Sequence, residues 1–229
     1  MSNNHEQSIA PPDKPVTPRL ILILGGARSG KSAFADRLAA SSRRSVAYIA
    51  TATAGDDEMR ERIARHRASR PQGWQTLEEP LDLARAVLQA AELADVLLLD
   101  CVTLWLGNML LQKPGQHDKI GETEEEFNTT GGLFDDRAMK EIEALLVAVN
   151  SLGPNKTLII VTNEVGLGIV PANPLSRLYR DTLGYVNQHL AQAADRVYLM
   201  VAGMAVDIKR LHVEDLLYEN HPEGTGSPL

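Results

Sequence analysis

A glycine-rich octapeptide, residues 25–32, carries the clearest chemical signal in the chain. Its residues match the pattern G-x-x-x-x-G-K-[ST] and are Gly25, Gly26, Ala27, Arg28, Ser29, Gly30, Lys31 and Ser32. Glycines let a backbone turn so tightly that several N–H groups face one phosphate at the start of a helix. In such a loop Lys31 reaches the β- and γ-phosphates, and the Ser32 hydroxyl is a ligand for Mg²⁺. The octapeptide therefore predicts a site for a nucleoside triphosphate.

The segments on either side of the octapeptide are of the types that the motif needs. Residues 20–24 form a short apolar run typical of a buried strand, and residues 33–40 are typical of a helix. The alternative is a glycine-rich turn that contains a lysine by chance. The order of strand, loop and helix favours the phosphate-binding interpretation.

Asp100 is a second candidate site residue, because it ends the apolar run 96–99. In proteins with this phosphate-binding loop, an acidic residue at the tip of a neighbouring strand binds Mg²⁺ directly or through water. The alternative is a helix cap, a position where aspartate is common. The place of Asp100 after an otherwise apolar strand favours the metal or nucleotide role.

A charged segment, residues 56–71, places His66 among five arginines between positions 60 and 70. Acids open the segment and arginines close it, which suits a helix dipole, and Pro71 ends it. Helical spacing would put Arg62, His66 and Arg70 on one face, where the guanidinium groups could bind phosphate. His66 is then a candidate nucleophile, and a solvated surface histidine is the alternative.

A loop at residues 162–171 combines glycines with the polar residues Asn163 and Glu164 directly after an apolar run. It suggests a site loop in which Glu164 could serve a substrate, and an ordinary connection between a strand and a helix is the alternative. The histidines, the acids and Cys101 show no metal-ligand spacing. Cys101 is expected to be a small buried residue.

The elements that must position these residues alternate along the chain. Continuous apolar runs predict buried strands at residues 20–24, 45–50, 96–100, 157–162 and 196–201. Helices are expected at residues 33–40, and roughly at 56–69, 80–94, 137–150 and 175–194. This order predicts an α/β fold like that of P-loop NTPases, with a doubly wound, mostly parallel sheet and helices on both faces. Ligands then bind at the carboxyl ends of the strands.

The 229 residues suit one domain, expected at residues 19–212 and carrying an acidic surface insertion at about 112–136. Residues 1–18 and 213–229 are expected to be flexible tails. A formal net charge of −7 argues against a general nucleic-acid or anionic-membrane binder. No apolar run approaches the length of a membrane span, no signal peptide is visible, and the single cysteine suits a reducing compartment. A cytoplasmic protein is expected.

Five segments together resemble the bifunctional adenosylcobinamide kinase / adenosylcobinamide-phosphate guanylyltransferase family of cobalamin biosynthesis. They are residues 25–32, 48–51, 57–71, 162–171 and 180–188, and the resemblance runs from about Leu20 to Lys209. The family phosphorylates the aminopropanol hydroxyl of adenosylcobinamide with ATP or GTP. It then transfers GMP from GTP to that phosphate through a GMP–histidine intermediate, which gives adenosylcobinamide-GDP and pyrophosphate. The alternatives are a simple small-molecule kinase, in which His66 is only a helix residue, and a non-enzymatic nucleotide switch or a motor ATPase subunit.

The resemblance implies a role for each matching residue. His66 and Lys31 are the expected catalytic residues, and Ser32 and Asp100 the expected Mg²⁺ ligands. Beyond the phosphate loop, nucleotide contacts are expected at Ala50, Thr51, Ala52, Arg67, Ala68, Ser69, Arg70, Glu78 and Asp100. Some relatives carry a second histidine where this chain has Arg65. A homotrimer with sites between subunits is also implied.

Overall fold

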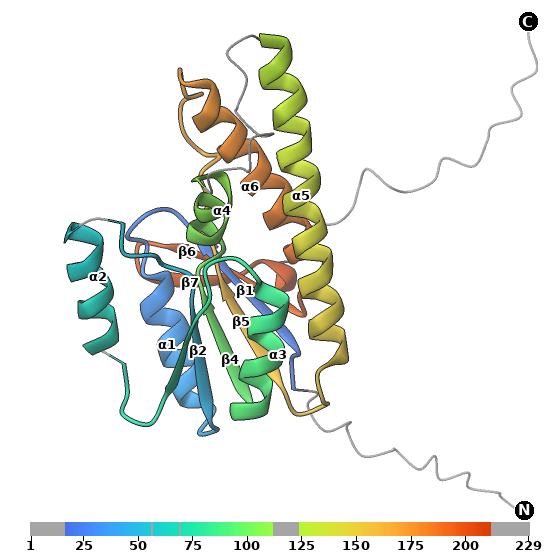
Figure 1. Cartoon of the computed structure of the whole chain (residues 1–229). Coiled ribbons are helices and arrows are strands. Elements are labelled where there is room, and N and C mark those ends of the chain that lie inside the picture. The colour runs from blue at the N-terminus through green and yellow to red at the C-terminus, as the bar shows by residue number, and fades with distance from the viewer. Residues whose placement is uncertain (1–16, 56, 69, 112–123, 212–229) are drawn as a thin grey trace, which may run out of the picture.

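The computed structural model describes residues 17–55, 57–68, 70–111 and 124–211, and seven strands within these ranges form one sheet (Figure 1). The strands are β1 (Leu20–Gly25), β2 (Val46–Ala50), β3 (Gln75–Glu78), β4 (Val96–Asp100), β5 (Thr157–Val161), β6 (Arg196–Val201) and β7 (Met204–Asp207). Their order across the sheet is β3-β2-β4-β5-β1-β6-β7. All neighbours pair in parallel except β6 and β7, which pair antiparallel. This architecture confirms the expected doubly wound α/β fold.

Helices cover both faces of this sheet (Figure 1). They are α1 (Lys31–Ser41), α2 (Asp57–Ala68), α3 (Leu83–Leu93), α4 (Val102–Leu111), α5 (Glu124–Ser151) and α6 (Pro174–Ala193), with a short 3₁₀ helix at Ile208–Arg210. Helix α1 lies on one face, and α3, α5 and α6 lie on the other (Figure 1). Helix α2 stands apart from the sheet at one side of the molecule (Figure 1). None of the helices in these ranges is long and apolar enough to cross a membrane.

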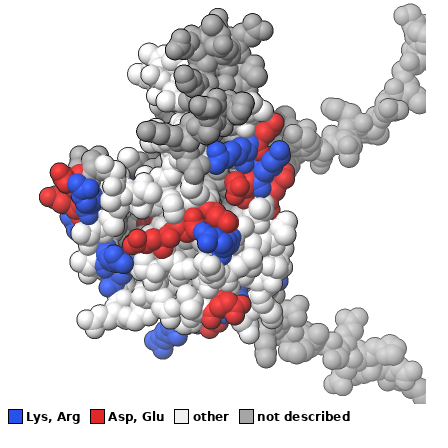
Figure 2. Space-filling view, viewed as in Figure 1, with Lys and Arg blue, Asp and Glu red and all other residues white. Residues whose placement is uncertain are grey.

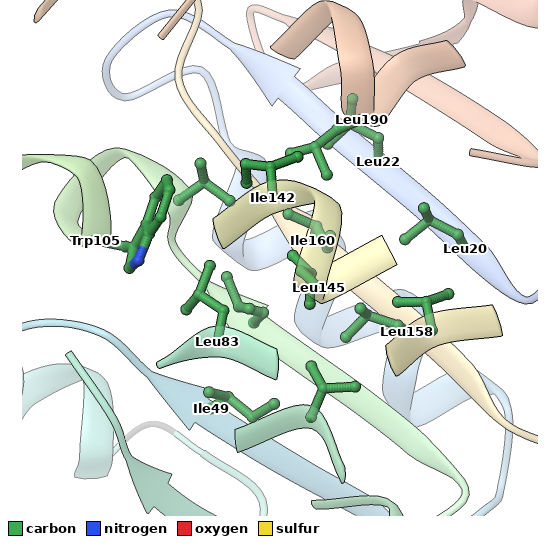
Figure 3. Close-up of a cluster of buried hydrophobic side chains, with 14 of the residues drawn as sticks. Leu20, Leu22, Ile49, Leu83, Trp105, Ile142, Leu145, Leu158, Ile160 and Leu190 are labelled. Carbon is green, nitrogen blue, oxygen red and sulfur yellow. The ribbon is translucent and has the colours of Figure 1, made fainter. Parts of the chain in front are cut away.

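The two faces of β1 show how the sequence divides the core. Successive side chains of a strand point to opposite faces, so Leu20 and Leu22 join one hydrophobic cluster while Ile21 and Ile23 join the other. The larger cluster gathers side chains from α3, α4, α5 and α6, including the fully buried Trp105 (Figure 3). The indole Nε1 of Trp105 donates a hydrogen bond to the Leu81 carbonyl at 2.8 Å. Helix α4 is thereby fixed against the segment before α3.

The structure corrects one element of the sequence interpretation. Residues 124–136 were expected to belong to an irregular acidic insertion, yet they form the first part of α5, which was expected to begin near residue 137. Acidic side chains are favourable in the first turn of a helix, and the sequence has three there, Glu124, Glu125 and Glu126. Gly131 is buried against Leu178 of α6, so this glycine lies at a helix contact and does not end the helix. The remainder of the insertion, residues 112–123, lies outside the described ranges. So do residues 1–16 and 212–229, which include all of the expected tails except residues 17 and 18.

Charged side chains of both signs are interspersed on the visible face of the molecule (Figure 2). Arg85 in the first turn of α3 forms ion pairs with Glu79 and Asp82. Such exposed pairs contribute little to stability. The parallel strand order is what positions the site, because it brings the carboxyl ends of β1, β5 and β4 next to one another.

Candidate active site

The phosphate loop between β1 and α1 is held in a conformation that its glycines permit. Gly25 has φ 152° and Gly30 has φ 96°, and Arg28 also has a positive φ of 57°. Glycine adopts such angles without the steric cost that a Cβ imposes. The Phe34 N–H donates to the Gly30 carbonyl at 2.9 Å, and the helix begins directly after the loop. The loop therefore has the strand–turn–helix geometry that the sequence predicted.

Lys31 lies inside this loop with 8% of its surface exposed. Its Nζ donates a hydrogen bond to the Gly26 carbonyl at 2.6 Å. Burial lowers the pKa of Lys31 below its usual value, while the neighbouring Cys101 and Asp100 act in the opposite direction. The side chain is thus held at the loop, where a phosphate group would meet it.

Asp100 at the end of β4 is fixed by Tyr48 of the neighbouring β2. The Tyr48 hydroxyl donates to Asp100 Oδ2 at 2.8 Å. Tyr48 is buried, and burial together with the Asp100 charge raises its pKa above the usual value. The carboxylate of Asp100 therefore accepts a hydrogen bond from a neutral hydroxyl.

Arg70 does not lie where the sequence interpretation placed it. Helix α2 ends at Ala68, so Arg70 is outside the helix and shares no helical face with His66. Its guanidinium lies 3.5 Å from the centre of the Tyr48 ring, and its Nη1 donates to Thr76 Oγ1 of β3 at 3.1 Å. The Arg62 side chain lies outside the described part of the structure. Contacts with β2 and β3, rather than helical spacing, bring Arg70 to the site.

Two cavities open at this edge of the sheet. The larger has a volume of about 740 Å³ and the smaller about 310 Å³. The larger is lined by phosphate-loop residues 27–32 together with Ala33, Glu61, Arg65, Thr103, Val161 and Asn163. The smaller is lined by Tyr48, Ala50, Ala52, Ala54, Met59, Ile63, Arg67, Arg70 and Glu78. Five residues line both cavities: Ser32, His66, Asp100, Cys101 and Leu104. His66 of α2 is therefore at the boundary between them.

Most of the expected nucleotide contacts are brought together by these cavities, but Gly25, Gly26, Thr51 and Ala68 are not among the residues that line either one. The Thr51 side chain is fully buried. Its Oγ1 accepts from the Cys101 N–H at 2.8 Å and donates to the Cys101 carbonyl at 2.7 Å. Thr51 therefore fixes the backbone beside Asp100. Ala68 is exposed at the end of α2, and Ser69 lies outside the described residues.

Sequence reasoning missed several residues that line the larger cavity. Thr103 lies in the first turn of α4, an element that was not expected, and Asn163 follows β5. The signal for Asn163 was present in the loop 162–171, but Glu164 was named as the candidate there. The structure instead shows Glu164 Oε1 accepting from the Gly166 N–H at 2.7 Å, so its carboxylate stabilises a turn.

The family described as cobinamide kinase / cobinamide phosphate guanyltransferase matches residues 21–208, a span that contains the phosphate loop, α2 and the loop after β5. The chain belongs to this family. The cobinamide kinase / cobinamide phosphate guanyltransferase match confirms the resemblance seen in the sequence.

Individual relatives agree with the family assignment. The bifunctional adenosylcobalamin biosynthesis protein CobP of Pseudomonas aeruginosa is 48% identical over 82% of this chain and 96% of its own length. Proteins named CobU from Salmonella typhimurium and Escherichia coli are 42% and 41% identical, and each match covers 83% of this chain and 99% of the relative. The similarity thus extends through the whole α/β domain of the family.

Proposed function

We propose that this enzyme carries out both reactions of its family, cobinamide phosphorylation and GMP transfer, at the two joined cavities, with His66 as the residue that carries GMP. The observation that carries the proposal is the shared boundary of the cavities. Ser32, His66 and Asp100 line both of them, so a nucleotide that spans the two has its phosphates next to His66. A covalent nucleophile needs this proximity to the α-phosphorus.

The smaller cavity suits the nucleoside part of GTP. Its walls include the apolar side chains of Ala52, Met59 and Ile63, which can contact a base, and the carboxylate of Glu78. Guanine carries two neighbouring N–H donors, and a carboxylate accepts two hydrogen bonds. Arg67 Nη2 lies 3.4 Å from Glu78 Oε1, so a cationic side chain that also lines the smaller cavity is next to this carboxylate. The triphosphate then extends toward Lys31 in the larger cavity.

In the phosphorylation step, the acceptor hydroxyl oxygen attacks the γ-phosphorus of ATP or GTP. A bond forms between that oxygen and the phosphorus, the bond to the β–γ bridging oxygen breaks, and the nucleoside diphosphate leaves. The hydroxyl proton passes to solvent. The Lys31 ammonium and the loop N–H groups orient the γ-phosphoryl group and stabilise its charge.

In the GMP transfer, an imidazole nitrogen of His66 attacks the α-phosphorus of GTP. A P–N bond forms, the bond to the α–β bridging oxygen breaks, and pyrophosphate leaves. A phosphate oxygen of the phosphorylated acceptor then attacks the same phosphorus, and the P–N bond breaks to restore the imidazole. The histidine divides one difficult displacement into two easier ones.

The residues present fit Mg²⁺. Ser32 and Asp100 offer a hydroxyl and a carboxylate at the boundary of the cavities, and hard cations prefer such oxygen ligands. Among the residues that the structure describes, no three His, Cys, Asp or Glu side chains gather into a metal cage. This donor set fits an ion that keeps waters and phosphate oxygens as its other ligands. When bound, Mg²⁺ would neutralise charge on the triphosphate.

A homotrimer is the assembly that we propose, on the family resemblance. The loop after β5 supports this proposal, because the apolar side chains of Leu167 and Ile169 are 87% and 97% exposed. Exposed apolar groups of this kind mark interaction sites. The Glu164 N–H in the same loop donates to the Gly25 carbonyl at 3.0 Å, so a second subunit seated there would lie next to the phosphate loop.

The decisive experiment is incubation with GTP labelled in its α-phosphate. Wild-type protein should retain acid-labile, alkali-stable GMP, and His66→Asn should retain none while still phosphorylating cobinamide with ATP at least in part. His189→Asn is the matched control, because His189 is an exposed histidine on α6, and it should label like wild type. A labelled His66→Asn protein would refute the nucleophile. If the wild-type protein retains no label, the covalent GMP step would be refuted and the protein would be a simple kinase.

A further inference from the structure

Asn163 lies just beyond the carboxyl end of β5, and neither of the two proposed reaction steps involves it so far. Strand β5 lies between β1, which leads into the phosphate loop, and β4, which ends in Asp100. In the parallel register Val161 is opposite Ile23 on one side and Asp100 on the other. Asn163 follows two residues later and lines the larger cavity. It is therefore placed between the phosphate loop and Asp100, the proposed Mg²⁺ ligand.

The backbone of Asn163 is held by side chains from two different helices. Its N–H donates to Thr103 Oγ1 of α4 at 2.8 Å, and its carbonyl accepts from Asn187 Nδ2 of α6 at 3.0 Å. Asn187 is itself fixed, because its Oδ1 accepts from the buried Thr162 hydroxyl at 2.8 Å. Both polar backbone groups of Asn163 are thus satisfied on the protein side, and a rigid backbone presents its side chain at the cavity.

We propose that the Asn163 carboxamide binds the acceptor hydroxyl in the phosphorylation step, an inference that rests on the proposed function. A carboxamide can accept a hydrogen bond from a hydroxyl through Oδ1 and donate one to a phosphoryl oxygen through Nδ2. It carries no charge that would repel either partner. Thr103 supports this placement, because its hydroxyl accepts from the Asn163 N–H and holds the backbone that carries the carboxamide.

The position of Asn163 would place the acceptor in a different cavity from the nucleoside. Asn163 and Thr103 line the larger cavity, whereas the residues assigned to the base line the smaller one. The attack of the acceptor oxygen on the γ-phosphorus releases the hydroxyl proton to solvent, and Asn163 takes up no proton. Its contribution is to orient the oxygen toward the phosphorus, and orientation is a large part of phosphoryl-transfer catalysis.

The test compares Asn163→Ala with Asn150→Ala, since Asn150 is an exposed asparagine near the end of α5. Asn163→Ala should lower kcat/KM for cobinamide about 10- to 100-fold in the ATP-dependent step. The Kd for ATP and the amount of GMP bound to His66 should stay within about twofold of wild type, because neither involves the acceptor. Asn163→Asp keeps the size of the side chain and should lose phosphorylation further, since its charge opposes the phosphates.

The possible failures are distinguishable. Wild-type protein that does not phosphorylate cobinamide would defeat the proposed function itself. An Asn163→Ala protein with the kcat/KM of Asn150→Ala would overturn only the acceptor role. Losses of ATP affinity and of the GMP adduct as large as the loss of kcat/KM for cobinamide would also overturn it. In that case Asn163 would act on the nucleotide or on the fold. If Asn163→Ala unfolds, the uncharged Asn163→Ser protein decides by the same measurements.

Discussion

In its proposed role Lys31 would bind phosphate only as an ammonium ion, yet burial lowers its pKa below the usual value of 10.5. The affinity for ATP should therefore fall as pH rises through this lowered pKa, and ATP binding there should take up a proton because bound phosphates restore the charge. Equilibrium titrations with ATP between about pH 7 and about pH 10 would measure this. Cys101, with its pKa raised by burial to about 12, does not titrate in this interval.

Lys31→Ala is the control for this pH dependence. Its affinity for the triphosphate should be greatly reduced, because this side chain is the one in the loop that reaches the phosphates. The remaining affinity should not change with pH over the same interval. A Lys31→Ala protein with the wild-type slope would assign the titration to another group.

At the residue scale, local motifs predicted the phosphate loop, Asp100 and His66, because each lies within a few residues of the element that presents it. Arg70 and Asn163 could not be placed in the same way. Arg70 depends on where α2 ends and on its stacking against Tyr48 of a distant strand. The role of Asn163 depends on α4 and α6, which hold its backbone from two sides. Contacts of this kind are set by tertiary structure.

The junction of β1, the phosphate loop and β6 should tolerate no side chain at Gly25. A Cβ there would lie 2.5 Å from the Met200 carbonyl oxygen of β6, and the residue has φ 152°. Gly25→Ala should therefore lower the free energy of unfolding by roughly 1–3 kcal/mol, measured by urea denaturation.

Gly26→Ala is the matched control for this junction. A Cβ at Gly26 meets nothing within 4 Å, so this substitution should change the free energy of unfolding by less than about 0.5 kcal/mol. If the two variants lose similar free energies of unfolding, the close approach of β6 to the loop is not the reason that position 25 requires glycine.

At the element scale, five of the strands were predictable because their runs are apolar on both faces, as a covered parallel sheet requires. Strand β3, with the sequence Gln-Thr-Leu-Glu, was missed because an edge strand of four mostly polar residues carries little periodic signal. Helix α4 was missed for the opposite reason. Its residues 102–111 are mostly apolar, so no amphipathic pattern marks it.

The whole molecule should have a mass in solution three times that of the 25.0 kDa chain, if the proposed trimer forms. Light scattering coupled to size-exclusion chromatography would measure it. Ile169→Asp should shift the mass toward the monomer, because a charge would replace an apolar side chain that is 97% exposed in the single chain. Val147→Asp, on the 68% exposed Val147 of α5, is the control and should leave the mass unchanged. A monomeric wild type would refute the trimer.

The buried ammonium of Lys31 lowers the stability of the folded protein, although the proposed binding of triphosphate requires it. Keeping a positive charge at a site that is 8% exposed, with the Gly26 carbonyl as its acceptor, costs the folded protein solvation that an apolar side chain would not lose. Lys31→Met should therefore melt at a higher temperature than wild type, by the equivalent of about 1 kcal/mol, although its affinity for triphosphate is greatly reduced. A selection for thermal stability alone would then favour loss of Lys31, so stabilised variants of this enzyme must be screened for ATP binding as well.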